Sequence, residues 1–197
     1  MISRENALKF LNENIENKNI VKHMLATEAL MRAVARKFQV PSTNFQTMEK
    51  ISEEEWGIVG LLHDGDYKPD IPVEKQGIEV TEILRKRGFE IPDSVAHAMA
   101  AHNHMTGVTP VSKMDWSLYC GDSLTGLIVA GVLVLPSKKL ADLTVESVLR
   151  RYREPSFARG TRRDEIALCE EKLGIPLPEF VGIVLQAMQG ISGELGL

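Results

Sequence analysis

The residues best suited to chemistry in this chain are two histidines and two aspartates, His23, His63, Asp64 and Asp122. His63 and Asp64 follow the apolar segment 56–62, and Asp122 lies inside a second apolar segment. Burying a carboxylate without a partner is costly, so we expect these acids to be paired, hydrogen-bonded or bound to a metal. If the four side chains converge from three helices, they offer a divalent ion four ligands and leave positions open for water.

The elements that must position these residues are helices. Apolar residues recur at helical spacing, no sustained alternation predicts a strand, and prolines and glycines fall mostly between the periodic segments. No linker rich in Gly, Ser or Pro divides the chain, so we predict an all-α fold, a single compact helical bundle over residues 1–197. The predicted helices span residues 4–16, 20–38, 52–63, 76–87, 92–103, 113–134, 143–151, 161–173 and 178–192.

Helix geometry sets conditions on three of the four residues. His23 lies at the border of the apolar stripe of its helix, so its side chain can point inward. Neighbouring residues such as His63 and Asp64 are about 100° apart on a helix, so both can reach one ion only if the helix ends there. Gly65 is consistent with such an end.

The fourth residue, Asp122, lies between two glycines. Gly121 and Gly126 can let another helix or a substrate come close, so a bulky replacement of Gly126 should disturb the site. Taken singly, these residues also have ordinary explanations: His23 as a hydrogen-bonded helical histidine, and Asp122 as the partner of an arginine. The ordered set of four favours the metal interpretation.

The order His, then His-Asp, then Asp in a helical chain resembles the HD superfamily of metal-dependent phosphohydrolases, which is named after the doublet. The string Leu-Leu-His-Asp-Gly-Asp-Tyr at 61–67 looks like the family signature, in which an apolar helix ends at the doublet and a small residue follows. The resemblance implies an HD-domain-like metal-binding core over roughly 20–130 and a helical extension over about 137–197. The metal ligands that it implies are His23, His63, Asp64 and Asp122.

One departure from the family pattern concerns the number of metal ions. Members that hold two metals carry further histidines between the doublet and the last aspartate. Gln76 stands where the first of these is expected, and His102 matches the second. Because one extra ligand is missing, we favour a single ion, and a dinuclear oxygenase becomes the least favoured function.

The resemblance implies a metal-dependent phosphohydrolase acting on a small phosphate ester, with a nucleotide as the favoured case. One divalent ion (Mn, Fe, Co, Ni, Zn or Mg) would polarise the phosphoryl oxygen and lower the pKa of a bound water to about 7. Asp64 could orient this water or accept its proton, and His102 or Lys68 could assist the leaving group. The alternative is a non-catalytic regulatory module that binds a metal and a nucleotide.

Arginines in the segment 157–163 are candidates for substrate binding. If this segment folds back over the metal, Arg159, Arg162 or Arg163 would neutralise the substrate, since guanidinium groups suit bidentate phosphate recognition. Their ordinary explanation is a solvated charged face. His104 belongs to a second group of histidines near a predicted helix end, for which a polar surface is the simpler explanation.

Composition limits the partners and the compartment. The chain has 197 residues and a formal net charge of −4, which gives no electrostatic reason to expect nucleic acid or an anionic membrane as a partner. The longest apolar run, 124–136, is too short for a membrane span of about 20 residues, and we find no secretory signal. Cys120 and Cys169 lack close spacing, so we expect reduced thiols. We predict a cytoplasmic protein, and the oligomeric state stays open.

Overall fold

The computed structural model of the chain describes residues 1–39 and 52–197. Within these residues every regular element is a helix, which confirms the all-α prediction. The α-helices are α1 Arg4–Asn14, α2 Lys18–Gln39, α3 Glu53–Leu62, α4 Glu79–Lys86, α5 Asp93–Ala101, α6 Lys113–Leu133, α7 Val145–Tyr152, α8 Arg163–Leu168, α9 Leu177–Gly190 and α10 Ser192–Leu195. Short 3₁₀ turns occur at Val73–Lys75, His104–Thr106 and Leu140–Asp142, and a π-helical turn, Cys169–Leu173, follows α8.

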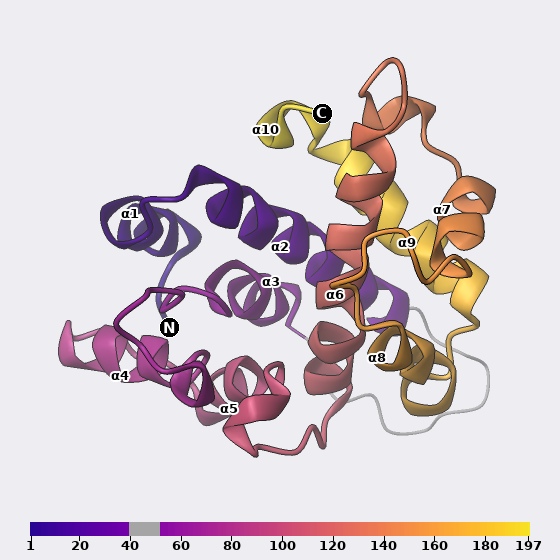
Figure 1. Cartoon of the computed structure of the whole chain (residues 1–197). Helices are drawn as coiled ribbons and strands as arrows, with labels where there is room; N and C mark the ends of the chain where they lie inside the picture. Colours follow the sequence, from indigo (N-terminus) through magenta and orange to yellow (C-terminus); the bar gives the residue numbers. More distant parts are fainter. Residues whose placement is uncertain (40–51) are drawn as a thin grey trace.

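Two long helices, α2 and α6, run through the middle of the molecule (Figure 1). The helix α2 packs against α3, α6 and α9, and α6 packs against α5, α7 and α8 as well. In Figure 1, α1, α3, α4 and α5 lie on one side of α6, and α7, α8 and α9 lie on the other. The two central helices therefore join the two groups of shorter ones.

Small residues let the central helices approach closely. A Cβ atom at Gly60 of α3 would lie 2.5 Å from the carbonyl oxygen of Thr27 in α2. A Cβ atom at Gly121 of α6 would lie 2.4 Å from Leu30 Cδ2, also in α2. Both distances are below van der Waals contact, so these glycines are needed where α3 and α6 meet α2.

Several helices begin at a side chain that caps their free N–H groups. The hydroxyl of Ser52 accepts a hydrogen bond from the backbone N–H of Glu55 at the start of α3. Ser112 and Asp115 form a reciprocal capping box at the start of α6. Such caps stabilise a helix start by about 1 kcal/mol and explain why the predicted starts of these two helices agree with the structure to within one residue.

The predicted helix 76–87 starts too early, because α4 begins only at Glu79. Gly77 adopts a φ of +91°, which a helix cannot accommodate. The buried carboxylate of Asp66 accepts hydrogen bonds from the backbone N–H groups of Gly77 and Val80. This contact joins the loop after α3 to the start of α4, so it could not be read from local sequence.

The helix α6 is long and apolar enough to span a membrane. The apolar run 124–136, considered alone in the sequence, is too short to do so. One such helix is weak evidence, since the core helix of a soluble protein passes the same test. More than half of the most apolar stretch of α6 is buried against other helices, and α6 also carries the buried carboxylate of Asp115. The absence of a membrane and the cytoplasmic location remain predictions.

Candidate metal centre

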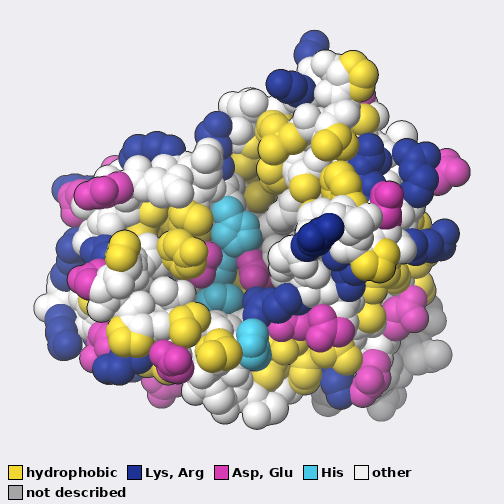
Figure 2. All heavy atoms as spheres, in the orientation of Figure 1, with side chains coloured by type: hydrophobic (Ala, Val, Ile, Leu, Met, Phe, Trp, Pro, Cys, Tyr) yellow, Lys and Arg dark blue, Asp and Glu magenta, His cyan; other side chains and the backbone are white. Residues whose placement is uncertain are grey.

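The four residues singled out in the sequence come together in space. His23 comes from α2, His63 and Asp64 from the end of α3, and Asp122 from α6. The Nε2 atoms of His23 and His63 are 3.2 Å apart, and His23 Nε2 is 2.8 Å from Asp122 Oδ1. Asp64 Oδ2 lies 3.5 Å from His63 Nε2 and 3.7 Å from His23 Nε2. Figure 2 shows histidine side chains gathered in a hollow on one face, with acidic side chains beside them.

These separations fit a shared ion. Two ligands at about 2.1 Å from a metal are about 3.0 Å apart in an octahedral arrangement and about 3.4 Å apart in a tetrahedral one. The separations given above fall around these values, and the ligand atoms of His23, His63 and Asp64 all lie within 4.8 Å of one another, a group that does not include Asp122. A mixed set of imidazole nitrogens and carboxylate oxygens suits Mn, Fe, Co, Ni or Zn. The donor set is therefore one that a divalent ion can use.

The end of α3 brings both members of the doublet to the cluster. The helix ends at Leu62, and His63 is its C-cap residue, as the sequence analysis required. Gly65 does not end the helix through a left-handed conformation, because its φ is not positive. A Cβ atom there would lie 2.8 Å from Val80 Cγ2, so Gly65 allows α4 to approach the turn after α3.

Contacts behind the two imidazoles direct their Nε2 atoms inward. His63 Nδ1 lies 2.8 Å from the carbonyl oxygen of Gly60, to which it can only donate. The hydroxyl of Thr125 donates to the backbone carbonyl of Asp122 and lies 3.1 Å from His23 Nδ1, from which it can accept. Partners of this kind fix the tautomer and orientation of metal-binding histidines.

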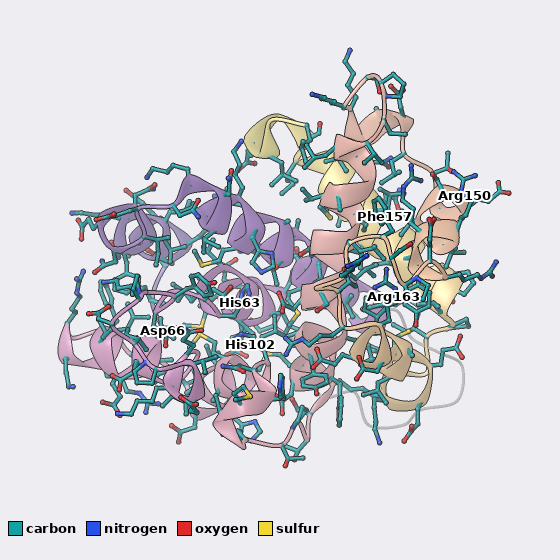
Figure 3. All side chains as sticks on the ribbon, in the orientation of Figure 1. His63, Asp66, His102, Arg150, Phe157 and Arg163 are labelled. Atoms are coloured by element: carbon teal, nitrogen blue, oxygen red, sulfur yellow. The ribbon has the colours of Figure 1, made fainter. Side chains whose placement is uncertain are left out.

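His102 lies at the edge of the same cluster, as predicted. Its ring is buried, its centroid is 4.9 Å from that of His63, and Figure 3 shows the two side by side. Its Nδ1 atom is 2.5 Å from the carbonyl oxygen of Met99, so Nε2 faces Asp64 Oδ1 at 3.4 Å. Gln76, which replaces the other extra histidine, donates from its side chain to the carbonyl of Ile71.

The electrostatics of the cluster follow from buried opposite charges. Burial lowers the pKa of His23, but the hydrogen bond and charge of Asp122 outweigh it and raise this pKa to about 9. Burial raises the pKa of Asp64, but the neighbouring histidines, His63 first, bring it down to about 2. The pKa of Asp122 is also well below its ordinary value, and that of His102 is raised by Asp64 in spite of burial. The paired charges therefore favour ionised carboxylates and a protonated His23, whose proton a metal ion would have to displace.

A hollow of about 520 Å³ opens beside the cluster. His23 of α2, Asp122 and Gly126 of α6, and the segment between α7 and α8 line it. Arg159 and Arg162 lie on that segment, so it does fold back over the cluster. Two guanidinium groups, those of Arg159 and Arg162, therefore border the cluster on the side where His23 and Asp122 line the hollow.

No family model, curated protein or solved structure matches this chain. The likeness to the HD superfamily therefore depends on the residues described above. It stays a resemblance.

Arg163 does not join the other two arginines. It does not line the hollow, and Figure 3 shows it near Phe157, on the opposite side of α6 from His63. Its guanidinium donates to six backbone carbonyls, those of Arg151, Tyr152, Glu154, Phe157, Ala158 and Thr161. The predicted role in phosphate binding is therefore replaced by a structural one, because Arg163 holds the segment that carries Arg159 and Arg162.

Lys68 also lies apart from the hollow. It lines a second hollow, of about 990 Å³, with Tyr67, Asp70 and the turn between α1 and α2. Neither His23 nor Asp122 borders that second hollow. Of the two residues predicted to assist the leaving group, His102 is the one placed at the cluster.

Sequence reasoning missed Thr125 and Glu165. Thr125 follows Asp122 by one helical turn, which is a signal that could have been used. Glu165 is buried and lies three residues after Arg162, with Oε2 at 2.9 Å from Arg162 Nε. His104, assigned to a polar surface, contacts Arg162 as well, with its Nδ1 atom 2.5 Å from Arg162 Nη1.

Proposed function

We propose that this protein is a metal-dependent phosphohydrolase that acts on a small phosphate ester and holds one divalent ion with His23, His63, Asp64 and Asp122. The observation that carries the proposal is the convergence of two Nε2 atoms and two carboxylates, with the Nδ1 atoms of both histidines engaged behind them. The hollow lined by Arg159 and Arg162 supports a phosphorylated substrate. A nucleotide remains the favoured case.

When bound, a divalent ion supplies a Lewis acid and an acidified water. Hydrolysis joins a water oxygen to phosphorus and breaks the ester P–O bond. Asp64, as a ligand, would orient the water or accept its proton, while Arg162 and Arg159, which line the hollow, would offset the charge of the phosphoryl oxygens. His102, whose Nε2 atom lies 3.4 Å from Asp64 Oδ1, would give a proton to the leaving oxygen.

The first test is metal content per chain, measured by plasma mass spectrometry on wild type and on Asp122→Ala. About one transition metal per wild-type chain, lost in the variant, is expected. Asp70→Ala is the matched control, because that aspartate lines the other hollow and should leave the metal content unchanged. Two metals per chain would instead favour the dinuclear oxygenase.

The second test is a screen of phosphate esters with the loaded protein and with Asp64→Ala. Turnover that disappears in the variant is expected. Nucleotide binding without turnover would overturn the hydrolase and leave the regulatory module. No metal in wild type even after reloading would overturn the hydrolase proposal and favour the binding module.

A further inference from the structure

Arg162 is held from three directions at the rim of the hollow. Its Nε atom lies 2.9 Å from Glu165 Oε2, its Nη1 atom 2.5 Å from His104 Nδ1, and its Nη2 atom 3.7 Å from Asp122 Oδ2. We infer that Glu165 and His104 are positioning residues that hold Arg162 for contact with the phosphate of the substrate. This inference rests on the proposed function.

Glu165 is suited to this role because its carboxylate depends on Arg162. The residue is 5% exposed, and among residues 1–39 and 52–197 its buried Oε2 atom has no hydrogen-bond partner, so the charge of Arg162 is its main compensation. The hydroxyl of Tyr119 in α6 interacts with the same carboxylate. Because α6 also carries Asp122, this contact relates the position of Arg162 to that of the cluster.

His104 completes the hold on the guanidinium. Arginine has no acceptor, so His104 Nδ1 must accept from Arg162 Nη1–H and carry its own proton on Nε2. With Nε and Nη1 engaged by side chains, Nη2 is the nitrogen directed towards the cluster. A phosphoryl oxygen beside Asp122 can therefore be met by Arg162 without a change in its position.

Asp122 cannot replace Glu165 as the counter-charge of Arg162. Its Oδ1 atom lies 2.8 Å from His23 Nε2 and 3.5 Å from His63 Nε2, which places Asp122 within the ligand set. When Asp122 shares its charge with an ion, Glu165 remains as the carboxylate that balances the charge of the Arg162 guanidinium. Loss of Glu165 should therefore free Arg162 and weaken phosphate binding while the ligands stay in place.

The test is the affinity of the metal-loaded protein for inorganic phosphate, measured by titration calorimetry. We compare wild type with Arg162→Ala, Glu165→Gln and the double variant. Arg162→Ala should weaken phosphate binding about tenfold, and Glu165→Gln about fivefold, at unchanged metal content. The double variant should be no weaker than Arg162→Ala, because Glu165 acts through Arg162.

Two further variants separate positioning from folding. Glu28→Gln is the matched control, since Glu28 is also a buried acid between two arginines, Arg4 and Arg32, but lies away from the hollow. It should bind phosphate as wild type does. His104→Ala should weaken phosphate binding about threefold, and because the His104 side chain is half exposed, this variant keeps the fold even if Glu165→Gln does not.

The outcomes for the inference and for the proposed function are distinct. Three outcomes would each overturn the inference. The first is wild-type phosphate affinity in both Glu165→Gln and His104→Ala, and the second is that Glu165→Gln lowers phosphate affinity equally with and without Arg162. The third is that wild type binds no phosphate. If the variants bind phosphate as expected while no ester is hydrolysed, the proposed hydrolase activity is wrong, but the positioning role of Glu165 and His104 is supported. If an ester is hydrolysed and Glu165→Gln leaves its KM unchanged, the positioning alone fails.

Discussion

At the scale of single residues, the cluster depends on what lies behind its histidines. The partner of His63 is the backbone carbonyl of Gly60, which side-chain replacement cannot remove. The partner of His23 is the hydroxyl of Thr125, which can be removed. The four residues of the cluster could be selected from the sequence, because only a few residue types bind metals. The hydroxyl could not, because threonine occurs in helices for many reasons.

Thr125→Val should lower metal affinity about tenfold to a hundredfold. Valine has nearly the shape of threonine and fits the buried position, but it cannot accept from His23 Nδ1–H. Competition with a chromogenic chelator measures the affinity. Thr125→Ser keeps the hydroxyl and serves as the control. Equal affinity in all three proteins would show that the hydroxyl does not orient His23.

The two thiols should make the folded chain less stable at alkaline pH. Burial raises the pKa of Cys169 from 9.0 to about 11 and that of Cys120 further. The unfolded chain therefore loses these protons first, and stability that is present below pH 9 falls as the pH rises towards 11. The loss is up to about 1.4 kcal/mol per pH unit for each thiol.

Urea unfolding at pH 8, 9 and 10 measures this dependence. The double variant Cys120→Ala with Cys169→Ala is the control, because it keeps every other group that titrates in this range. Its free energy of unfolding should fall less steeply with rising pH than that of wild type. Parallel curves would mean that the thiols contribute nothing to the pH dependence.

At the scale of elements, the two glycines of α6 have different surroundings. A Cβ atom at Gly126 would meet no atom of the described residues within 4 Å, and Gly126 lines the hollow. A Cβ atom at Gly121 would collide with Leu30 of α2. Gly126→Leu should therefore keep or raise stability, since leucine favours helix, and should fill the hollow.

The expected result is weaker phosphate binding for Gly126→Leu and a lower Tm for Gly121→Ala. Alanine at Gly121 should cost about 1–3 kcal/mol through overpacking. Calorimetric phosphate titration and thermal unfolding of both variants give the comparison. A Gly126→Leu protein that binds phosphate as wild type does would place the substrate outside this hollow.

Most helix positions could be predicted because they depend on periodicity and on local caps. The failures have long-range causes. The start of α4 is set by the carboxylate of Asp66, which lies in the turn after α3. Arg163 differs from Arg159 and Arg162 because the folded segment brings six carbonyls around it, and the sequence presents all three as equivalent.

At the scale of the whole molecule, the cluster lies where the two groups of helices meet. Its residues come from α2, from the end of α3 and from α6, and the arginines of the hollow come from the segment between α7 and α8. Figure 1 shows that these elements come from both sides of α6. An ion bound here would therefore connect segments that are distant in the sequence.

Metal removal should lower the stability of the entire chain. Because the unfolded chain does not hold the four ligands together, an ion stabilises the folded state by about 2.7 kcal/mol when its free concentration is 100 times Kd. Thermal unfolding with added metal and after chelation measures the difference. Asp122→Ala should lose most of this metal-dependent shift in Tm, since it removes the ligand that α6 contributes. An equal shift in wild type and Asp122→Ala would mean that the metal stabilises the chain from another place, and the cluster would then lose its strongest support.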